Sequence, residues 1–306
     1  MSAALIAIDW GTTSARAYRL DAGGKLIDER SAPLGVQKVA PNGFPGALAT
    51  LLGGHVDDNV PMISCGMIGS RQGWIEAPYR ECPADFAAIA TALTSVPGTR
   101  LSIVPGLICH DLAGVPDVMR GEETQIVGAL DEKAPDRGAA HVVVLPGTHS
   151  KWALAGPAGI ETFATFMTGE LYSVLREHSI LGRLAVAGDD PEALARGVRR
   201  SLDADASLSH DLFSARTLAL TAKLAPRAVG DYLSGLLLGA EVAAGRRWLE
   251  RHVVTGGSVT LIGDAALCER YRNVLGLVGI DSTLGPADAA ARGLWRIAQR
   301  AGMVRA

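Results

Sequence analysis

The first thirty residues alternate between short apolar runs and polar turns. Residues 5–9 form an apolar run, and after a polar turn residues 15–20 mix apolar and polar positions; a third segment, 25–30, follows the Ala-Gly-Gly sequence at 22–24. Runs joined by short glycine-containing turns are typical of β-hairpins. The pattern therefore predicts three successive strands joined by tight turns.

The rest of the chain mixes helical and extended patterns and repeats this opening. Apolar residues at helical spacing and β-branched apolar runs predict, in order, helix 47–52, strand 60–65, helix 83–93 and strand 101–104. A strand at 140–145, with 152–154 and 160–163, forms a second strand-turn-strand-turn-strand unit. Since each unit has a Gly-Thr turn after its first strand, we expect two similar domains that hold one nucleotide between them.

The predicted boundary between the domains is a charged stretch with one proline, near 131–138. It divides the chain into an N-terminal domain, 1–133, and a C-terminal domain, 134–306. The C-terminal domain continues with a mostly helical region, a buried strand and a closing helix, at 171–250, 258–262 and 287–300.

Composition and charge narrow the class of protein. With 306 residues, of which 48% are hydrophobic, the chain can bury two cores of ordinary size. The net charge is −3 and the Lys and Arg residues are scattered, which argues against nucleic-acid binding. No apolar run reaches the ~18 residues of a membrane span, and no export signal is recognisable. The four cysteines lack metal-binding spacing, so we expect reduced thiols in a cytoplasmic protein.

The turn after the first strand is suited to a phosphate. Gly11, Thr12 and Thr13 offer backbone N–H groups and hydroxyls to an anion. Asp9, just before the turn, would repel bare phosphate but would hold a phosphate-bound Mg²⁺, usually through waters. The alternative is an ordinary tight turn with a solvated aspartate.

The corresponding turn of the second unit is more polar. It combines backbone donors, two hydroxyls and one ammonium, from Gly147, Thr148, Ser150 and Lys151. This set suits a polyphosphate. Later, Gly263 and Asp264 form a strand-to-helix junction where adenine and ribose can approach the backbone. A polar loop and a routine connection are the alternatives at these two places.

Two adjacent glutamates are candidates for acid-base chemistry. Glu122 and Glu123 occupy the first turn of a predicted helix that begins near Gly121. The helix dipole favours carboxylates there, which alone can explain them. A carboxylate at a helix N-terminus can also accept a proton from a substrate hydroxyl.

A glycine-rich loop in the N-terminal domain suits a small, polar, anionic ligand. Arg71 suits a carboxylate, Gln72 suits hydroxyl groups, and Trp74 suits the face of a sugar. Tyr79 lies in the same loop, and Glu170 is a further candidate of this kind in the C-terminal domain. The alternative is a structured surface loop with Trp74 packed in the core.

These segments, in this order, resemble the motifs of the sugar-kinase, Hsp70 and actin superfamily. Within it the chain resembles the 2-dehydro-3-deoxygalactonokinase family over nearly its whole length, through DWGTTSARAYRL, CGMIGSRQGWIEAPYRECPA, VMRGEETQIVGAL, LPGTHSKW, FMTGELYSVLR and GDAAL. The resemblance implies an α/β fold of two ribonuclease-H-like domains, each a mixed sheet flanked by helices, with the active site in the cleft between them. It also implies ATP-dependent phosphorylation of the C6 hydroxyl of 2-dehydro-3-deoxy-D-galactonate, a sugar acid of galactonate catabolism.

The resemblance also implies roles for individual residues. Asp9 would hold Mg²⁺, and the first turn would face the terminal phosphates of ATP. Gly147 and Thr148 would clasp the β-phosphate. The whole set for ATP is Asp9, Gly11, Thr12, Thr13, Arg16, Gly147, Thr148, Ser150, Lys151, Gly263 and Asp264.

The resemblance leaves the catalytic base open. Related carbohydrate kinases such as glycerol kinase carry Gly-Asp-Gln at a helix start, where this chain has Gly121, Glu122 and Glu123. The base is therefore Glu122, Glu123 or the nearby Asp117.

Two other functions stay open. A phosphatase or ATPase of the same fold would use the glutamates to orient water, and a non-catalytic nucleotide switch would use ATP to move a partner. The loop that contains Arg71 and Trp74 favours a small-molecule site. The sequence does not distinguish the galactonate acid from its gluconate epimer, and it leaves homodimer formation open.

Overall fold

The computed structural model describes residues 2–53, 59–130, 141–156, 159–203, 205, 207–252 and 259–305. The chain forms two compact units, and neither is continuous in sequence. Unit 1 consists of Met1–Ala140, Ala153–Phe163 and Gly285–Ala306. Unit 2 consists of His141–Trp152 and Ala164–Leu284.

The predicted N-terminal strands form the larger sheet of unit 1. Its strands are Leu5–Trp10 (β1), Ala15–Leu20 (β2), Leu26–Ala32 (β3), Met62–Gly66 (β4), Thr94–Ser95 (β7) and Leu101–Ile103 (β8). They follow the order β3-β2-β1-β4-β8-β7. β1 and β2 are antiparallel, as are β2 and β3, whereas β1 is parallel to β4. The three hairpin strands predicted from the sequence are confirmed.

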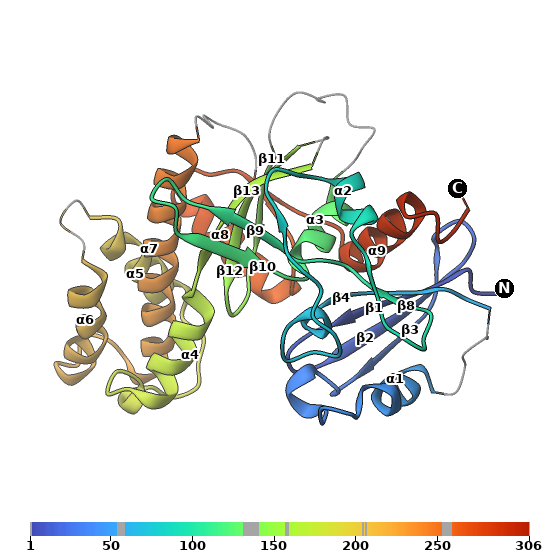
Figure 1. Ribbon diagram of the computed structural model, residues 1–306. Coiled ribbons are helices and arrows are strands. Elements are labelled where there is room, and N and C mark those ends of the chain that lie inside the picture. Colours follow the sequence, from blue (N-terminus) through green and yellow to red (C-terminus); the bar gives the residue numbers. More distant parts are fainter. Residues whose placement is uncertain are drawn as a thin grey trace. The chain divides into compact units, whose positions relative to one another are not determined.

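Helices cover both faces of this sheet. Phe44–Leu52 (α1) lies on one side and Ala289–Arg300 (α9) on the other (Figure 1). Along β1, Ile8 and Trp10 pack into one core cluster with Phe44. Because both faces are covered, nearly every residue of β1 is buried, as expected for a central strand.

The C-terminal helix belongs to unit 1 because it crosses helix Glu122–Ala129 (α3) at close range. Gly128 of α3 and Gly293 of α9 lie where the other helix leaves no room for a Cβ. Arg296 of α9 donates from Nη1 to the carbonyl of Val127 at 2.7 Å. The units therefore differ from the predicted division at 133/134, which also lies outside the described residues.

A smaller sheet of unit 1 did not emerge from the sequence. Its strands, in the order β10-β9-β5, are Pro116–Met119 (β10), Leu107–His110 (β9) and Arg80–Glu81 (β5). These strands are two to four residues long and carry polar side chains, so they lack a clear apolar run. Helix Phe86–Thr91 (α2) is shorter than predicted at both ends. It starts at Phe86 because Asp85 caps it, accepting from the Ala88 N–H at 2.5 Å.

The third sheet contains the second set of predicted strands, which are His141–Leu145 (β11), Ser150–Gly156 (β12), Gly159–Phe166 (β13) and Val259–Leu261 (β14). Two short edge strands, Ala84–Asp85 (β6) and Ser282–Leu284 (β15), were not predicted, and β6 lies where the sequence predicted the start of a helix. The order is β15-β14-β11-β12-β13-β6. The division between the units falls inside β12 and β13. The predicted turn at 157–158 and the start of the last strand at Ser258 lie outside the described residues.

The two large sheets share one topology. The order β3-β2-β1-β4-β8 in one matches β13-β12-β11-β14-β15 in the other. In each, the first strand is parallel to the next inner strand, β1 to β4 and β11 to β14. The internal repeat predicted from the sequence is thus present as two α/β sheets with equivalent strand orders.

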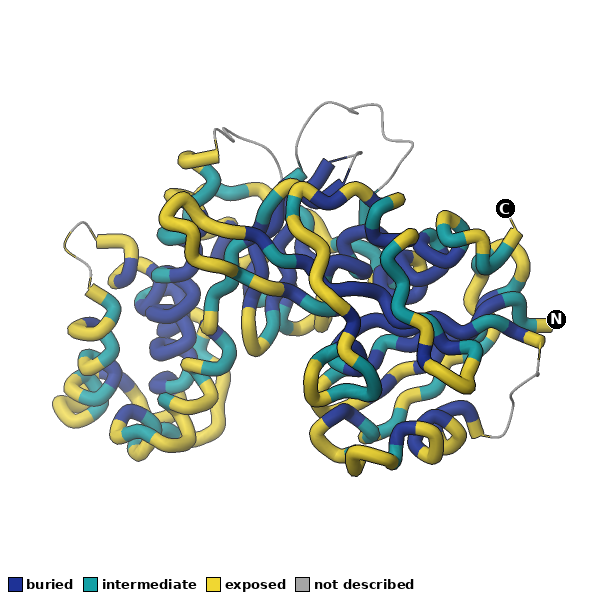
Figure 2. The backbone as a smooth tube through the Cα atoms, viewed as in Figure 1, coloured by how far each residue is buried: buried dark blue, intermediate teal, exposed yellow. Residues whose placement is uncertain are grey.

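Unit 2 is mostly helical, as predicted. Its helices are Thr168–His178 (α4), Pro191–Ser201 (α5), Leu208–Leu220 (α6), Val229–Arg251 (α7) and Ala265–Leu277 (α8). Helix α7 is buried over much of its length (Figure 2) and crosses α5 where Gly197 and Gly235 meet. Short 3-10 helices occur at Val36–Lys38 (η1), Met67–Gly69 (η2), Gly182–Leu184 (η3) and Pro226–Ala228 (η4). No helix in the described ranges combines the length and apolar character that crossing a membrane requires.

Candidate active site

The turn at residues 11–14, called the phosphate-1 turn below, connects β1 to β2 and is supported by a neighbouring loop. The N–H of Gly11 donates to the carbonyl of Ser14 at 2.9 Å, which closes the turn. The N–H groups of Val36 and Gln37 donate to the carbonyls of Gly11 and Thr12 at 3.1 and 3.2 Å. The side chains of Thr12 and Ser14 are exposed. The turn therefore has a fixed backbone and hydroxyls that remain available to a ligand.

Asp9 lies on β1 beside this turn and is partly buried. Its cross-strand neighbours are Arg16 on β2 and Cys65 on β4. Burial raises the pKa of Asp9, the Arg16 guanidinium lowers it, and the carboxylate of Glu122 raises it. Asp9 is thus one member of a pair of carboxylates, with one arginine that partly compensates their charge.

Two glycines bring α3 to the end of β4. Gly66 and Gly121 both have positive φ, 88° and 110°, a backbone conformation that glycine adopts without steric cost. A Cβ on Gly121 would lie 3.2 Å from the Cα of Gly66. This close approach places Glu122, the first residue of α3, within electrostatic range of Asp9.

The two candidate glutamates have different environments. Glu122 is partly exposed, and its Oε2 accepts from the N–H of Arg120 at 2.9 Å. Glu123 is fully buried, and its oxygens accept from the N–H of Gly121 at 2.6 Å and from Thr124 Oγ1 at 2.9 Å. Burial, with a contribution from Glu122, raises the pKa of Glu123 to about 7. Glu122 is therefore the more accessible base, whereas Glu123 is held inside the protein.

Asp117, the third candidate base, lies on β10 in the smaller sheet of unit 1. It is in register with Cys109 on β9, and its Oδ1 accepts from the N–H of Val118 at 2.7 Å. The structure thus places Asp117 on a different sheet from Asp9.

The predicted substrate loop separates into exposed and packed residues. The side chain of Arg71 is 88% exposed and pairs with Glu76 at 3.0 Å, and Gln72 is also exposed. Trp74 stacks on Phe44 with ring centroids 5.9 Å apart and packs against the core of unit 1. The packed position of Trp74 corresponds to the alternative considered in the sequence analysis, since one face of its ring is already covered.

Arg120 is a residue near the site that sequence reasoning missed. Its guanidinium lies 4.3 Å from the centre of the Tyr79 ring, and its Nη2 donates to the carbonyl of Ala77 at 2.8 Å. Arg120 therefore connects the loop that contains Tyr79 to the start of α3, where Glu122 lies. Its place directly before the Gly-Glu-Glu segment was the signal that could have identified it.

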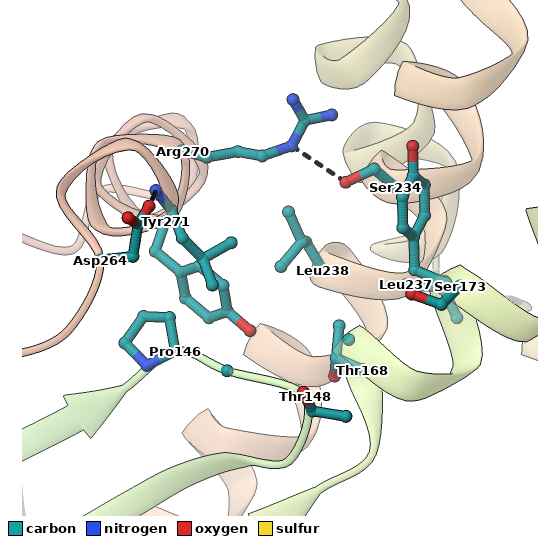
Figure 3. A pocket seen from close by; sticks show the side chains of 14 residues that line it. Pro146, Thr148, Thr168, Ser173, Ser234, Leu237, Leu238, Asp264, Arg270 and Tyr271 are labelled. Atoms are coloured by element: carbon teal, nitrogen blue, oxygen red, sulfur yellow. Dashed lines mark hydrogen bonds between the residues drawn. The ribbon is translucent and has the colours of Figure 1, made fainter. Parts of the chain in front are cut away.

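Unit 2 contains a pocket of 530 Å³, a size typical of small-molecule sites. It is lined by the turn at residues 146–151, called the phosphate-2 turn below, and by helices α4, α7 and α8. The lining residues are Pro146, Gly147, Thr148, Thr168, Gly169, Tyr172, Ser173, Ser234, Leu237, Leu238, Asp264, Leu267, Arg270 and Tyr271 (Figure 3). Arg270 donates from Nε to Ser234 Oγ at 3.0 Å and pairs with Asp231. The pocket therefore combines an apolar wall with hydroxyls and one fixed guanidinium.

Three of the predicted residues for phosphate and adenosine line this pocket: Gly147, Thr148 and Asp264. Asp264 also caps α8, since its Oδ1 accepts from the N–H of Leu267 at 3.0 Å. Gly263 precedes it with a φ of 148°, and a Cβ there would lie 3.3 Å from the Pro146 carbonyl oxygen. The sequence thus identified the turn and the helix start that form one side of the pocket.

The start of α4 packs against the phosphate-2 turn. A Cβ on Gly169 would collide with the carbonyl of Gly147, and the N–H of Glu170 donates to the carbonyl of Thr148 at 2.9 Å. The side chain of Glu170 lies 2.5 Å from Nε2 of His149, and both are half-exposed. Glu170 is therefore engaged with the phosphate-2 turn itself.

Ser150 and Lys151, two of the predicted contacts to the phosphates of ATP, are buried in the structure. Both lie at the beginning of β12 and are buried, at 0% and 5% exposure. Ser150 Oγ donates to Glu241 at 2.7 Å, and Lys151 Nζ donates to Thr165 Oγ1 at 2.6 Å. Their polar groups point into unit 2 because strand β12 starts immediately after the turn.

The chain matches the model of the 2-keto-3-deoxy-galactonokinase family over residues 9–297. It belongs to this family. It is 37% identical to the 2-dehydro-3-deoxygalactonokinase of Escherichia coli (strain K12) over 292 residues, which cover 95% of each chain. The similarity therefore extends over both units.

Solved structures give the same result for the fold. A protein of Sinorhizobium meliloti, described as a candidate 2-dehydro-3-deoxygalactonokinase, superposes with a TM-score of 0.85 at 36% identity, covering 96% of this chain and 98% of that one. The activator of the 2-hydroxyisocaproyl-CoA dehydratase of Clostridium difficile, solved with bound ADPNP, has a TM-score of 0.52 at 11% identity, with 97% and 95% covered. The latter similarity concerns the fold alone. The two-domain α/β fold of sugar kinases is thereby confirmed.

In this kinase family member, the arrangement in unit 1 suits a divalent cation that arrives with phosphates. The carboxylate of Glu122 raises the pKa of Asp9, and a bound cation would oppose this effect. The described residues contain no group of three or more His, Cys, Asp and Glu side chains that could hold a metal. Mg²⁺ commonly binds through one or two carboxylates, waters and substrate phosphates, so a single aspartate fits this cation.

Proposed function

We propose that this protein is an ATP-dependent sugar-acid kinase that phosphorylates the C6 hydroxyl of 2-dehydro-3-deoxy-D-galactonate. The observation that carries the proposal is the 37% identity with a named 2-dehydro-3-deoxygalactonokinase over 95% of both chains. The family model matches residues 9–297, a range that includes the phosphate-1 turn, the Gly-Glu-Glu segment and the phosphate-2 turn. Backbone hydrogen bonds hold both turns in place, from Gly11 to Ser14 in the first and from Glu170 to Thr148 in the second.

In the proposed reaction, Asp9 would hold the Mg²⁺ that arrives with ATP, and this cation would neutralise charge at the phosphates. The turn from Gly11 to Thr13 receives the terminal phosphates, while the pocket of unit 2 takes the adenosine. Phosphoryl transfer depends mainly on such positioning and charge stabilisation.

Glu122 is the proposed general base, because it is the accessible member of the glutamate pair. Its carboxylate accepts the proton of the C6 hydroxyl as the oxygen forms its bond to the γ-phosphorus. The bond between that phosphorus and the β,γ-bridging oxygen breaks, and ADP leaves. Arg71, Gln72 and Tyr79 remain the proposed contacts to the sugar acid.

The proposed site of action is the cytoplasm, where thiols stay reduced. All four cysteines, Cys65, Cys82, Cys109 and Cys268, are free thiols in the structure.

A coupled assay of ADP release tests this proposal. Purified protein receives MgATP with 2-dehydro-3-deoxy-D-galactonate, with its gluconate epimer, or with no sugar. We expect turnover with the galactonate acid and little without sugar. No sugar-dependent turnover with either epimer would eliminate the kinase assignment, and release of phosphate from ATP alone would favour an ATPase. Preference for the gluconate acid would keep the kinase and change its substrate.

A further inference from the structure

Glu241 on α7 is a buried carboxylate that accepts four hydrogen bonds. Only 3% of its surface is exposed. Oε1 accepts from Ser150 Oγ at 2.7 Å and from Trp152 Nε1 at 2.8 Å, and Oε2 accepts from the Tyr271 hydroxyl at 2.8 Å. The hydroxyl of Thr168 also bonds to this carboxylate. A buried carboxylate with this many donors has its hydrogen-bonding capacity largely satisfied.

The donors come from the elements that build the nucleotide pocket. Ser150 begins β12, two residues after Thr148 of the phosphate-2 turn. Thr168 begins α4, and Tyr271 extends from α8 toward it (Figure 3). Thr148, Thr168 and Tyr271 all line the pocket. One carboxylate thus connects the turn to two of the helices that surround the ligand space.

Trp152 is held by α7 at two points. Its indole donates to Glu241, and a Cβ on Gly245 would lie 2.7 Å from its ring. Positions 241 and 245 are four apart and therefore share one face of the helix. Trp152 is fully buried and is not a lining residue of the pocket. Any effect of its indole N–H on the pocket therefore passes through Glu241.

We propose that Glu241 is the positioning residue of the nucleotide pocket, holding β12, α4 and α8 in the arrangement that receives the phosphates and adenosine. The inference rests on the proposed function in one respect, which is that this pocket binds ATP. Glu241 acts through Ser150, Thr168 and Tyr271 and touches no reacting atom. In a satisfied buried network, loss of one acceptor leaves its donors unpaired and shifts the elements that carry them.

The variant Glu241→Gln tests the inference with little change in volume. The amide NH₂ cannot accept a hydrogen bond, so at least one of the donors loses its acceptor. The measurement is calorimetric titration with MgADP in the absence of sugar. We expect the Kd for MgADP to rise about tenfold, the effect of losing one to two buried hydrogen bonds. The KM for ATP should rise by a similar factor, while the KM for the sugar acid stays within about twofold, because the network lies at the nucleotide.

Asp211→Asn is a matched control for general destabilisation of unit 2. Asp211 on α6 is 1% exposed and accepts from Arg200 Nε at 2.7 Å and from the N–H of Ser207 at 2.9 Å. It is a buried carboxylate of the same unit that lies outside the pocket lining. We expect this variant to lower the melting temperature as Glu241→Gln does, with the Kd for MgADP unchanged.

Trp152→Phe keeps the inference testable if Glu241→Gln fails to fold. It keeps an aromatic ring against Gly245 but removes the N–H that donates to Glu241, and we expect a rise of a few-fold in the Kd for MgADP. Wild-type affinity in every folded variant of the network would overturn the inference, as would an equal loss in Asp211→Asn. If the wild-type chain does not bind MgADP, both this inference and the proposed function are overturned. If the wild-type chain binds MgADP and the network variants bind it equally well, only this inference is overturned.

Discussion

The backbone of Gly121 lies against that of Gly66, so that a Cβ on Gly121 would sit 3.2 Å from the Cα of Gly66. Gly66 ends β4, the parallel neighbour of the strand that carries Asp9. Gly121 directly precedes Glu122. Two residues without side chains therefore set how closely the start of α3 approaches the end of β4, and with it how near Glu122 comes to Asp9.

Replacement of Gly121 by alanine should lower kcat by more than a loss of folding stability alone would explain. The added Cβ requires a shift of a few tenths of an ångström between α3 and β4, and alanine is also strained at a φ of 110°. Because a misplacement of about 1 Å can cost on the order of 100-fold in rate, we expect this smaller shift to lower kcat by up to about 10-fold in the coupled assay. Gly98→Ala is the control, since Gly98 also has positive φ, 73°, but nothing lies within 4 Å of its Cβ position. Equal losses of kcat in the two variants would contradict the positioning role of Gly121.

Replacement of Glu122 by glutamine should remove the proposed base. The amide keeps the size of the side chain but cannot take the proton of the sugar hydroxyl, and a general base contributes about 10²-fold to 10⁴-fold. We expect kcat to fall by that factor while the Kd for MgATP stays within about threefold. Glu123→Gln is the matched variant, one residue further along and fully buried. A larger loss of kcat in Glu123→Gln than in Glu122→Gln would transfer the role of base to Glu123.

Much of the fold could be predicted because short segments of sequence encode its strands, turns and helix starts. The hairpins of β1, β2 and β3 need only apolar alternation and a short turn, and the helix start at Glu122 follows a glycine. The internal repeat was also recognisable, since each set of strands carries its own Gly-Thr turn. The equivalent strand orders of the two sheets confirm it.

The chemical environment of single residues could not be predicted because their partners lie far away in sequence. Glu123 is buried and Glu122 is partly exposed, and the helix that carries both, α3, packs against α9, which lies some 170 residues later in the sequence. Ser150 belongs to a polar turn by its neighbours, yet its hydroxyl bonds to Glu241 on α7. Sequence spacing identified the turns but gave no means to distinguish a ligand contact from a bond inside the core.

Trp74 should contribute to stability rather than to sugar binding. Its ring stacks on Phe44 and packs against the core of unit 1, and truncation of such a residue to alanine costs about 3 kcal/mol. We expect Trp74→Ala to lower the free energy of unfolding by that amount in urea, and Trp74→Phe to retain most of it. Arg71→Ala, which truncates an 88% exposed side chain of the same loop, should leave stability unchanged. A tenfold rise in the KM for the sugar acid in Trp74→Phe, with stability retained, would instead assign the ring to the substrate.

Glu123 should make stability depend on pH near neutrality. Burial raises its pKa from 4.5 to about 7, so between these values the folded protein keeps a proton that the unfolded chain has released. In this range of pH, unfolding releases a proton. The free energy of unfolding is therefore highest below about pH 4.5, and it falls by a few kcal/mol as the pH rises through 7. Glu123→Gln imitates the protonated form, so its advantage over the wild type in urea unfolding should grow from pH 5 to pH 8. Glu177→Gln, at a side chain that is 67% exposed, should show no such trend. A difference in the free energy of unfolding between Glu123→Gln and the wild type that stays constant from pH 5 to pH 8 would mean that Glu123 is ionised throughout.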